Sequence, residues 1–350
     1  MQTLTSMNLT ELKSFFNHLG EREFHASQMM DWVYKKGVLN YDKMTNLSQG
    51  LRDKLEKELH ITTLELVKVS KSEDLETVKF LWKLPQGDLI ESVLISSGDR
   101  RTVCVSSQVG CPAKCAFCAS GKQGFFRNLT PSEIVEQIVQ INAWLVLKNE
   151  RVSHIVYMGM GEPLKNYEAV TKSIRLICDP ALLNLSERRI TVSTVGIVEG
   201  IHRLAKENMK VNLVLSLHAP NQHIRLKIIP YARKYPLEDI LAAMDEYSKV
   251  TKRDPTYEYV MLAGINDHPD HARELGHLLK GKQGTVNLIP YNPVEGLRLR
   301  RPDKNAIKQF RAVLYGCKIV NTCRYTKGDD IAAACGQLAM QEKILKVINE

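Results

Sequence analysis

Residues 111–118 read Cys-Pro-Ala-Lys-Cys-Ala-Phe-Cys, a run with three cysteines at CxxxCxxC spacing and no fourth cysteine nearby. A structural zinc site normally has four protein ligands, and a four-iron cluster that the protein closes completely has four thiolate ligands. Three thiolates on one short loop instead leave one iron of such a cluster open to the nitrogen and oxygen donors of a substrate or cofactor. The alternatives are a zinc knuckle and cysteines that only fill the core.

Length and composition indicate an ordinary soluble globular protein. The chain has 350 residues, of which 44% are apolar and 25% charged, enough for one large α/β domain and a smaller one. No apolar run approaches the roughly 20 residues of a membrane span, and the first residues do not resemble a secretory signal. We therefore expect a cytoplasmic protein without a membrane partner. In that compartment, eight cysteines indicate metal or redox chemistry rather than a disulfide framework.

The first hundred residues predict a helical unit followed by strands. Leu12, Phe15, Phe16 and Leu19 recur at helical spacing, and two more helices are expected over 26–36 and 47–59. Alternation over 64–95 with a turn at Pro85-Gln-Gly-Asp predicts a β-hairpin.

From about residue 100, strand-like and helical segments alternate, which is typical of a parallel sheet. Six such units predict an incomplete (β/α)6 barrel of the TIM type, with its chemistry at the carboxyl ends of the strands. We expect a helical accessory domain at 1–70, a β-hairpin linker at 71–99, the barrel core at 100–328 and a C-terminal tail at 329–350. The expected strands are 102–106, 154–158, 189–193, 211–216, 256–261 and 285–289, and the expected helices are 132–147, 168–177, 237–250, 271–279 and 303–314.

Polar motifs follow the expected strands. Gly159-Met-Gly-Glu-Pro contains glycines that permit close backbone approach and a carboxylate that can accept hydrogen bonds from a cationic amine. Ser193, Ser216-Leu217-His218 and Asn292 also stand at strand ends, where their groups suit a ribose, a carboxylate or an adenine edge. Each of these residues alone would more often be a structural polar group.

Two cysteines outside the loop also stand out. Cys104 lies in the first barrel strand, and Cys335 lies in Ala332-Ala-Ala-Cys-Gly-Gln-Leu near the C-terminus. A cysteine among small residues is usually core filler, but the adjacent glycine leaves room for a ligand. We interpret Cys178, Cys317 and Cys323 as structural.

The motifs together resemble one enzyme family. The CxxxCxxC loop is the signature of radical S-adenosylmethionine (SAM) enzymes. The segments 104–111, 158–163, 216–221 and 328–338 (Cys-Val-Ser-Ser-Gln-Val-Gly-Cys, Met-Gly-Met-Gly-Glu-Pro, Ser-Leu-His-Ala-Pro-Asn and Gly-Asp-Asp-Ile-Ala-Ala-Ala-Cys-Gly-Gln-Leu) are similar to the RlmN/Cfr family of radical SAM methyltransferases acting on RNA adenosines. The similarity covers roughly residues 10–340, and the longer motif forms resemble the RlmN branch. Family enzymes usually have Asp where this chain has Ala332.

The resemblance implies a cofactor set and residue roles. Cys111, Cys115 and Cys118 would hold a [4Fe–4S] cluster, and SAM would bind its open iron. Cys335 would receive a methyl group as a thioether, and a 5′-deoxyadenosyl radical would remove a hydrogen from it. The resulting carbon would add to the adenine, after which Cys104 would form a disulfide with Cys335 and release the product. The SAM contacts implied are Gly161, Glu162, Ser193, Ser216, Leu217, His218 and Asn292, and Glu91 would take the C2 proton.

The implied substrates are the 23S ribosomal RNA adenosine near the peptidyl-transferase centre and the transfer RNA adenosine 3′ of the anticodon. The net charge of +9, whose excess lies entirely after residue 150, suits a phosphate backbone, with Arg298, Arg300 and Arg301 as candidate contacts. An external electron donor such as flavodoxin or ferredoxin is expected, and the protein is expected to be a monomer.

Three alternatives stay open at this point. A Cfr-type enzyme would methylate C8 of the same ribosomal adenosine. A radical SAM enzyme that modifies protein would need neither Cys335 nor the basic second half. A zinc-bound RNA-binding protein would not need the loops at 159–163 and 216–221.

Overall fold

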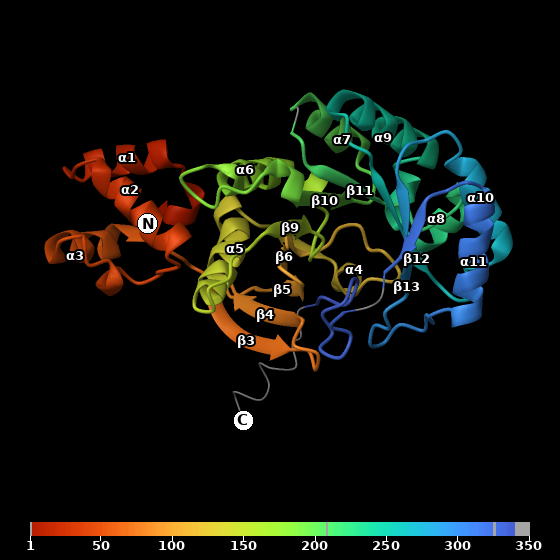
Figure 1. Cartoon of the computed structure of the whole chain (residues 1–350), viewed down its shortest axis with the longest axis horizontal. Helices are drawn as coiled ribbons and strands as arrows, with labels where there is room; N and C mark the ends of the chain where they lie inside the picture. Colours follow the sequence, from red (N-terminus) through yellow and green to blue (C-terminus); the bar gives the residue numbers. More distant parts are fainter. Residues whose placement is uncertain (1, 208, 325–326, 340–350) are drawn as a thin grey trace.

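One large sheet organises the molecule in the computed structural model, which describes residues 2–207, 209–324 and 327–339. Ten strands follow the order β14-β13-β12-β11-β10-β9-β6-β5-β4-β3. From β6 to β14 all neighbouring strands are parallel, and helices cover the outer face of this part (Figure 1). The observed architecture confirms the expected α/β fold with an incomplete barrel.

The elements in the described part of the chain have the following bounds. The α-helices are α1 (Leu9–His18), α2 (Phe24–Met30), α3 (Gln49–Glu58), α4 (Ala119–Gln123), α5 (Pro131–Val146), α6 (Tyr167–Cys178), α7 (Val198–Lys206), α8 (Gln222–Ile228), α9 (Leu237–Thr251), α10 (Pro269–Leu278) and α11 (Lys304–Gly316). The strands are β1 (Gln2–Thr3), β2 (Leu59–His60), β3 (Glu65–Lys71), β4 (Thr77–Lys83), β5 (Leu89–Ser97), β6 (Arg100–Cys104), β7 (Gln108–Gly110), β8 (Phe125–Asn128), β9 (His154–Tyr157), β10 (Ile190–Thr194), β11 (Asn212–Ser216), β12 (Thr256–Met261), β13 (Thr285–Pro290) and β14 (Asn321–Cys323).

Every barrel strand and helix expected from the sequence is present, and three further elements are not among those expected. These are α7, α8 and the edge strand β14. The β14 segment Asn-Thr-Cys has no apolar alternation, and it pairs on one side with β13. A short strand of this kind is set by its partner, so periodicity cannot predict it.

The segment expected to be a β-hairpin linker instead extends the barrel sheet. Strands β3, β4 and β5 are antiparallel, and β5 pairs directly with β6 in a register that joins Val93 to Cys104. The division of the chain at residues 70, 99 and 328 stays a prediction. Residues 340–350 of the expected C-terminal tail lie outside the described residues.

The N-terminal helices form a separate group beside α5 (Figure 1). A capping box between Asn8 and Glu11 starts α1, and Leu12 and Phe16 on its inner face are buried. The last turn of α2 continues as a π-helix over Asp31–Lys35.

Glu136 on α5 joins this group to the barrel. Its carboxylate is fully buried and accepts the backbone N–H groups of Thr63 (2.6 Å) and Leu64 (2.8 Å) and the hydroxyl of Thr5 (3.2 Å). Burial raises the pKa of Glu136, and these donors oppose the rise. One carboxylate therefore fixes two segments of the N-terminal unit to the barrel.

We expect Glu136→Ala to lower the free energy of unfolding by about 3 kcal/mol, because two buried amides lose a charged acceptor. Urea unfolding followed by circular dichroism measures the change. The exposed Glu56 on α3 is the matched control, and Glu56→Ala should change stability by less than about 0.5 kcal/mol. Equal stability of the two variants would contradict the role of Glu136.

Candidate active site

The three-cysteine run forms a loop between β7 and α4. On one side the Ala116 N–H donates to the carbonyl of Ile228 at the end of α8 (2.9 Å). On the other side the Ala119 N–H donates to the Gly336 carbonyl (2.8 Å), and the Ser120 hydroxyl donates to the Leu338 carbonyl (2.5 Å). The loop is therefore held between α8 and the C-terminal segment that carries Cys335.

The three thiols of this loop suit a multinuclear cluster better than a single ion. Cys111 and Cys115 are buried and Cys118 is half-buried. Burial raises the pKa of the Cys111 thiol to about 12, and the neighbouring Cys118 adds to the rise. Among the described residues, no group of three or more His, Cys, Asp or Glu side chains is positioned to hold one metal ion, which removes the geometric basis for a zinc knuckle. Thiolates that bind separate irons of one cluster stand farther apart, and a bound cation would stabilise them.

A cavity beside the loop gathers residues from the carboxyl ends of the barrel strands. Most residues predicted from the strand-end motifs lie here with the cluster cysteines and Cys335. The lining includes Cys111, Cys115, Phe117, Cys118, Gly159, Gly161, Glu162, Ser193, Ser216, His218, Glu258, Tyr291, Cys335 and Gly336.

The Gly159–Pro163 motif carries a buried carboxylate into this cavity. Burial raises the pKa of Glu162 to about 7, while its oxygens accept the N–H groups of Leu164 (3.0 Å) and Val195 (2.8 Å). Gly161 has a left-handed φ of 109°, and a Cβ there would lie 2.7 Å from the Ser107 hydroxyl. The glycine is thus needed first for packing against the protein itself.

Ser193, Ser216 and His218 present polar groups from adjacent strand ends. The hydroxyls of Ser193 and Ser216 lie 3.3 Å apart. His218 accepts the Val260 N–H at Nδ1 (3.0 Å), which leaves Nε2 as the ring N–H donor. Burial lowers the pKa of His218 to about 3, so the ring is neutral at physiological pH.

Two predicted SAM contacts do not line the cavity. Leu217 is fully buried, and its N–H donates to the Glu258 carbonyl (3.0 Å). Asn292 donates to the carbonyl of Cys335 (3.1 Å) and accepts from Arg301 (3.0 Å). In this structure Asn292 therefore fixes the C-terminal segment.

Cys335 and Cys104 approach each other from distant parts of the chain. Cys335 lines the cavity and is exposed, whereas Cys104 at the end of β6 is buried. Burial raises the pKa of Cys104 to about 12, and the charge of Cys335 contributes to that rise. Burial also raises the pKa of Cys335, and Glu258 adds to the effect. Both are free thiols.

Glu91 does not line the cavity but lies beneath the segment that carries Cys335. Its buried carboxylate pairs with Lys79 (3.0 Å) and accepts the Ala339 N–H (2.8 Å), while Lys79 also donates to the Ala332 carbonyl (3.2 Å). Burial raises the pKa of Glu91, and Lys79 opposes the rise. Ala332, which differs from the family motif, has a left-handed φ of 50° and makes this contact through its backbone.

Sequence reasoning missed Glu258 and Arg225. Glu258 is buried within β12 and lines the cavity. A carboxylate in the apolar run Tyr-Glu-Tyr-Val-Met could have signalled it, since buried parallel strands are nearly all apolar. Arg225 on α8 is fully buried, and nothing in the local sequence distinguishes it from a surface arginine.

Comparisons with known proteins agree with this geometry. Residues 2–61 match the model of the ribosomal RNA large subunit methyltransferase N-terminal domain, and residues 105–275 match that of the radical SAM superfamily. The chain is 74% identical to a probable dual-specificity RNA methyltransferase RlmN 2 of Protochlamydia amoebophila, covering 93% of this chain and 90% of that protein. It is 44% identical to the dual-specificity RNA methyltransferase RlmN of Marinobacter nauticus, covering 96% and 92%.

The chain belongs to the RlmN family. The crystal structure of a radical SAM methyltransferase from Sphaerobacter thermophilus, 41% identical, superposes with a TM-score of 0.94 and covers 97% of this chain and 99% of that one. This RlmN-family protein is a SAM-dependent RNA methyltransferase, and radical SAM enzymes use a [4Fe–4S] cluster and SAM as cofactors. In the described part of the chain, no helix combines the length and apolar character needed to cross a membrane.

The ion pair beneath the Cys335 segment yields a test in this RlmN-family protein. Glu91→Ala would leave the Lys79 ammonium buried without its carboxylate and the Ala339 N–H without its acceptor, a loss of about 3 kcal/mol. Alkylation of Cys335 by iodoacetamide, followed by peptide mass spectrometry, should become at least about tenfold faster. Glu65→Ala, which removes the carboxylate of the exposed Lys83 pair, should leave the rate unchanged. Equal alkylation rates in both variants would contradict the clamp.

Proposed function

We propose that this RlmN-family enzyme methylates C2 of adenosine in 23S ribosomal RNA and in transfer RNA through a thioether on Cys335. The observation that carries the proposal is the meeting of Cys335 and Cys104 beside Cys111, Cys115 and Cys118. The printed names of the relatives, dual-specificity RNA methyltransferases, support the two RNA classes. C2 of adenine is an sp² carbon that is neither acidic nor nucleophilic, so it cannot take a methyl group directly from a sulfonium.

The proposed cofactor site fits the donors at hand. Cys111, Cys115 and Cys118 would hold the cluster, and Glu162, Ser193, Ser216 and the Nε2–H of His218 would hold SAM. When bound, the cluster and SAM supply a radical that removes one hydrogen from a methyl group. Glu162 would accept hydrogen bonds from the methionyl ammonium, since its buried carboxylate lies at the cavity wall.

The remaining steps belong to the protein's own residues. Cys335 loses its thiol proton and receives a methyl group from one SAM, and the activated methylene then forms a bond to C2. Glu91 takes the C2 proton after the segment over it moves, because its carboxylate is now held by Lys79 and Ala339. Cys104 loses its proton and attacks the Cys335 sulfur, so that the sulfur–carbon bond breaks as the disulfide forms.

Cluster binding tests the first part of the proposal. Cys115→Ala should lose the visible iron–sulfur absorption after anaerobic reconstitution, because one iron loses its thiolate. Cys323→Ala on the edge strand β14 is the matched control and should keep that absorption. A complete cluster in Cys115→Ala would refute the assignment.

The two lone cysteines test the second part. Cys104→Ala should still accept the methyl group and react with RNA, but it should accumulate a covalent protein–RNA species that migrates slowly on a denaturing gel and collapses with nuclease. Cys335→Ala should give neither adduct nor product. Normal turnover by Cys104→Ala, or methylated RNA from Cys335→Ala, would show that the methyl group does not travel through a protein thioether.

RNA binding requires cationic surface near the cavity. Arg301 is engaged within the protein, where its Nε donates to the Tyr291 carbonyl (2.6 Å) and its guanidinium reaches Asp329 (3.5 Å). Arg298 and Arg300 are exposed and stay candidates for phosphate contacts.

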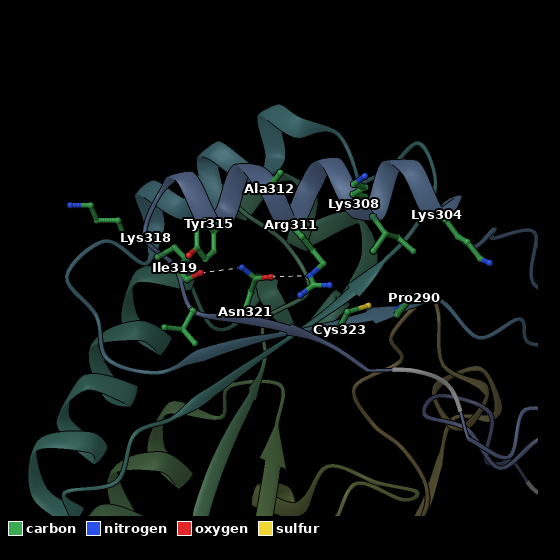
Figure 2. A pocket seen from close by; sticks show the side chains of 12 residues that line it. Pro290, Lys304, Lys308, Arg311, Ala312, Tyr315, Lys318, Ile319, Asn321 and Cys323 are labelled. Carbon is green, nitrogen blue, oxygen red and sulfur yellow. Dashed lines mark hydrogen bonds between the residues drawn. The ribbon is translucent and has the colours of Figure 1, made fainter.

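A second cationic surface runs between α11 and β14 (Figure 2). Its lining, which lies in the described part of the chain, includes Lys304, Lys308, Arg311 and Lys318 and contains no carboxylate. Tyr315 beside them is 80% exposed, and an exposed ring next to cations suits a nucleic-acid strand. Pro290 at the carboxyl end of β13 lines this groove, whereas its neighbours Ile289 and Tyr291 line the cavity, so the groove adjoins the site.

We expect the triple variant Lys304→Ala, Lys308→Ala, Arg311→Ala to bind RNA with a salt slope about 2 units shallower, because each lost phosphate contact removes nearly one unit. Filter binding across a salt series measures the slope. A control triple variant, Lys206→Ala, Lys249→Ala, Lys252→Ala, removes exposed lysines at α7 and α9. A slope shared by the wild type and the groove variant would exclude the groove from RNA binding.

A further inference from the structure

Arg225 is a fully buried cation at the base of the candidate site. Its guanidinium donates to three backbone carbonyls at the ends of β10 and β11, those of Val195, Ser216 (2.9 Å) and Leu217. Its Nε has no hydrogen-bond partner among the described residues. The side chain is therefore fixed in direction, and one of its buried donors is unused.

The described residues give Arg225 no carboxylate partner. None of the ion pairs in the described ranges includes it, although nearly every other deeply buried charge of the site has a partner, as Lys79 has Glu91. A buried charge without an opposite charge is costly. Burial lowers the pKa of Arg225 to about 10, so it keeps its proton at neutral pH despite that cost.

The group that faces Arg225 is the cysteine loop. Helix α8, which carries Arg225, receives the Ala116 N–H at its end through Ile228 (2.9 Å). Ile224 and Ile228 of the same helix pack with Cys111 and Cys115 in one apolar cluster. The opposite charge that acts on Arg225 is that of Cys115, and Arg225 in turn lowers the pKa of the Cys115 thiol.

We propose that Arg225 is the counter-charge for the anionic cluster held by Cys111, Cys115 and Cys118, and that it raises the reduction potential of that cluster. The inference rests on the proposed cluster site. A four-iron core of formal charge 2+ bound by three thiolates carries one net negative charge, and accepting one electron from an external low-potential one-electron donor adds a second. No bond to protein forms or breaks in this step. A fixed cation in a low-dielectric site stabilises the more negative state, and charge near a cluster is a known determinant of its potential.

Arg225 is thereby a positioning residue that acts through the cluster and through three strand-end carbonyls. The carbonyl contacts hold the guanidinium in place, and they also join the ends of β10 and β11, which carry Ser193 and Ser216. A purely structural role would need the hydrogen bonds but not the charge. The two roles are separable because lysine keeps the charge and glutamine keeps only polar donors.

The experiment compares wild type, Arg225→Lys and Arg225→Gln as full-length, anaerobically reconstituted protein. An EPR-monitored redox titration gives the midpoint potential of each cluster, and iron and sulfide analysis gives its occupancy. We expect Arg225→Gln to have a more negative potential than wild type, and Arg225→Lys to stay close to wild type. The rise in melting temperature on reconstitution should also be smaller for Arg225→Gln than for Arg225→Lys.

Each outcome decides the question. Failure of Arg225→Gln, but not of Arg225→Lys, to retain iron supports the counter-charge. Equal potentials in wild type and Arg225→Gln overturn it. So does equal loss of cluster or of fold in both variants, because that pattern shows a requirement for arginine geometry rather than for charge. A wild-type protein that binds no cluster would instead refute the proposed cluster site itself.

Discussion

The docking of segment 328–339 onto the cysteine loop is the contact on which the candidate site depends. Cys335 reaches the cavity only because the carbonyls of Gly336 and Leu338 accept hydrogen bonds from Ala119 and Ser120 next to the loop. From the other side, Asn292 holds the Cys335 carbonyl and Glu91 holds the Ala339 N–H. These partners come from the cysteine loop, the end of β13 and β5, so the fold must be complete before the site exists.

The same docking explains why buried ionic groups surround the segment. A buried ion pair contributes little to stability compared with an apolar core, but it is costly to break on one side only. The Lys79–Glu91 pair uses that property, because each partner also holds a backbone group of the segment. An arrangement of this kind favours one position of Cys335 over others and still lets the whole segment move as a unit when Cys335 reacts.

Much of the fold could be predicted because the barrel strands are buried apolar runs followed by polar strand-end residues. The cysteine loop, Glu162, Ser193, Ser216 and His218 fall where a parallel sheet brings its carboxyl ends together. Long-range pairing was beyond the sequence. Asn292 and Arg301 look like ligand and phosphate contacts in isolation, yet they bind each other and the C-terminal segment. Arg225 and Glu258 were missed because a charged residue reveals its burial only when the surrounding elements are in place, and the roles given to Glu91, Cys104 and Cys335 came from family resemblance.

The most direct measurement is nucleoside mass spectrometry of RNA incubated with the anaerobically reconstituted protein, SAM and a low-potential reductant. Unmodified 23S ribosomal RNA and transfer RNA from a strain that lacks this activity are the substrates. The account predicts 2-methyladenosine in both RNAs. The absence of methylated adenosine from an enzyme with a full cluster, or 8-methyladenosine in its place, would contradict it.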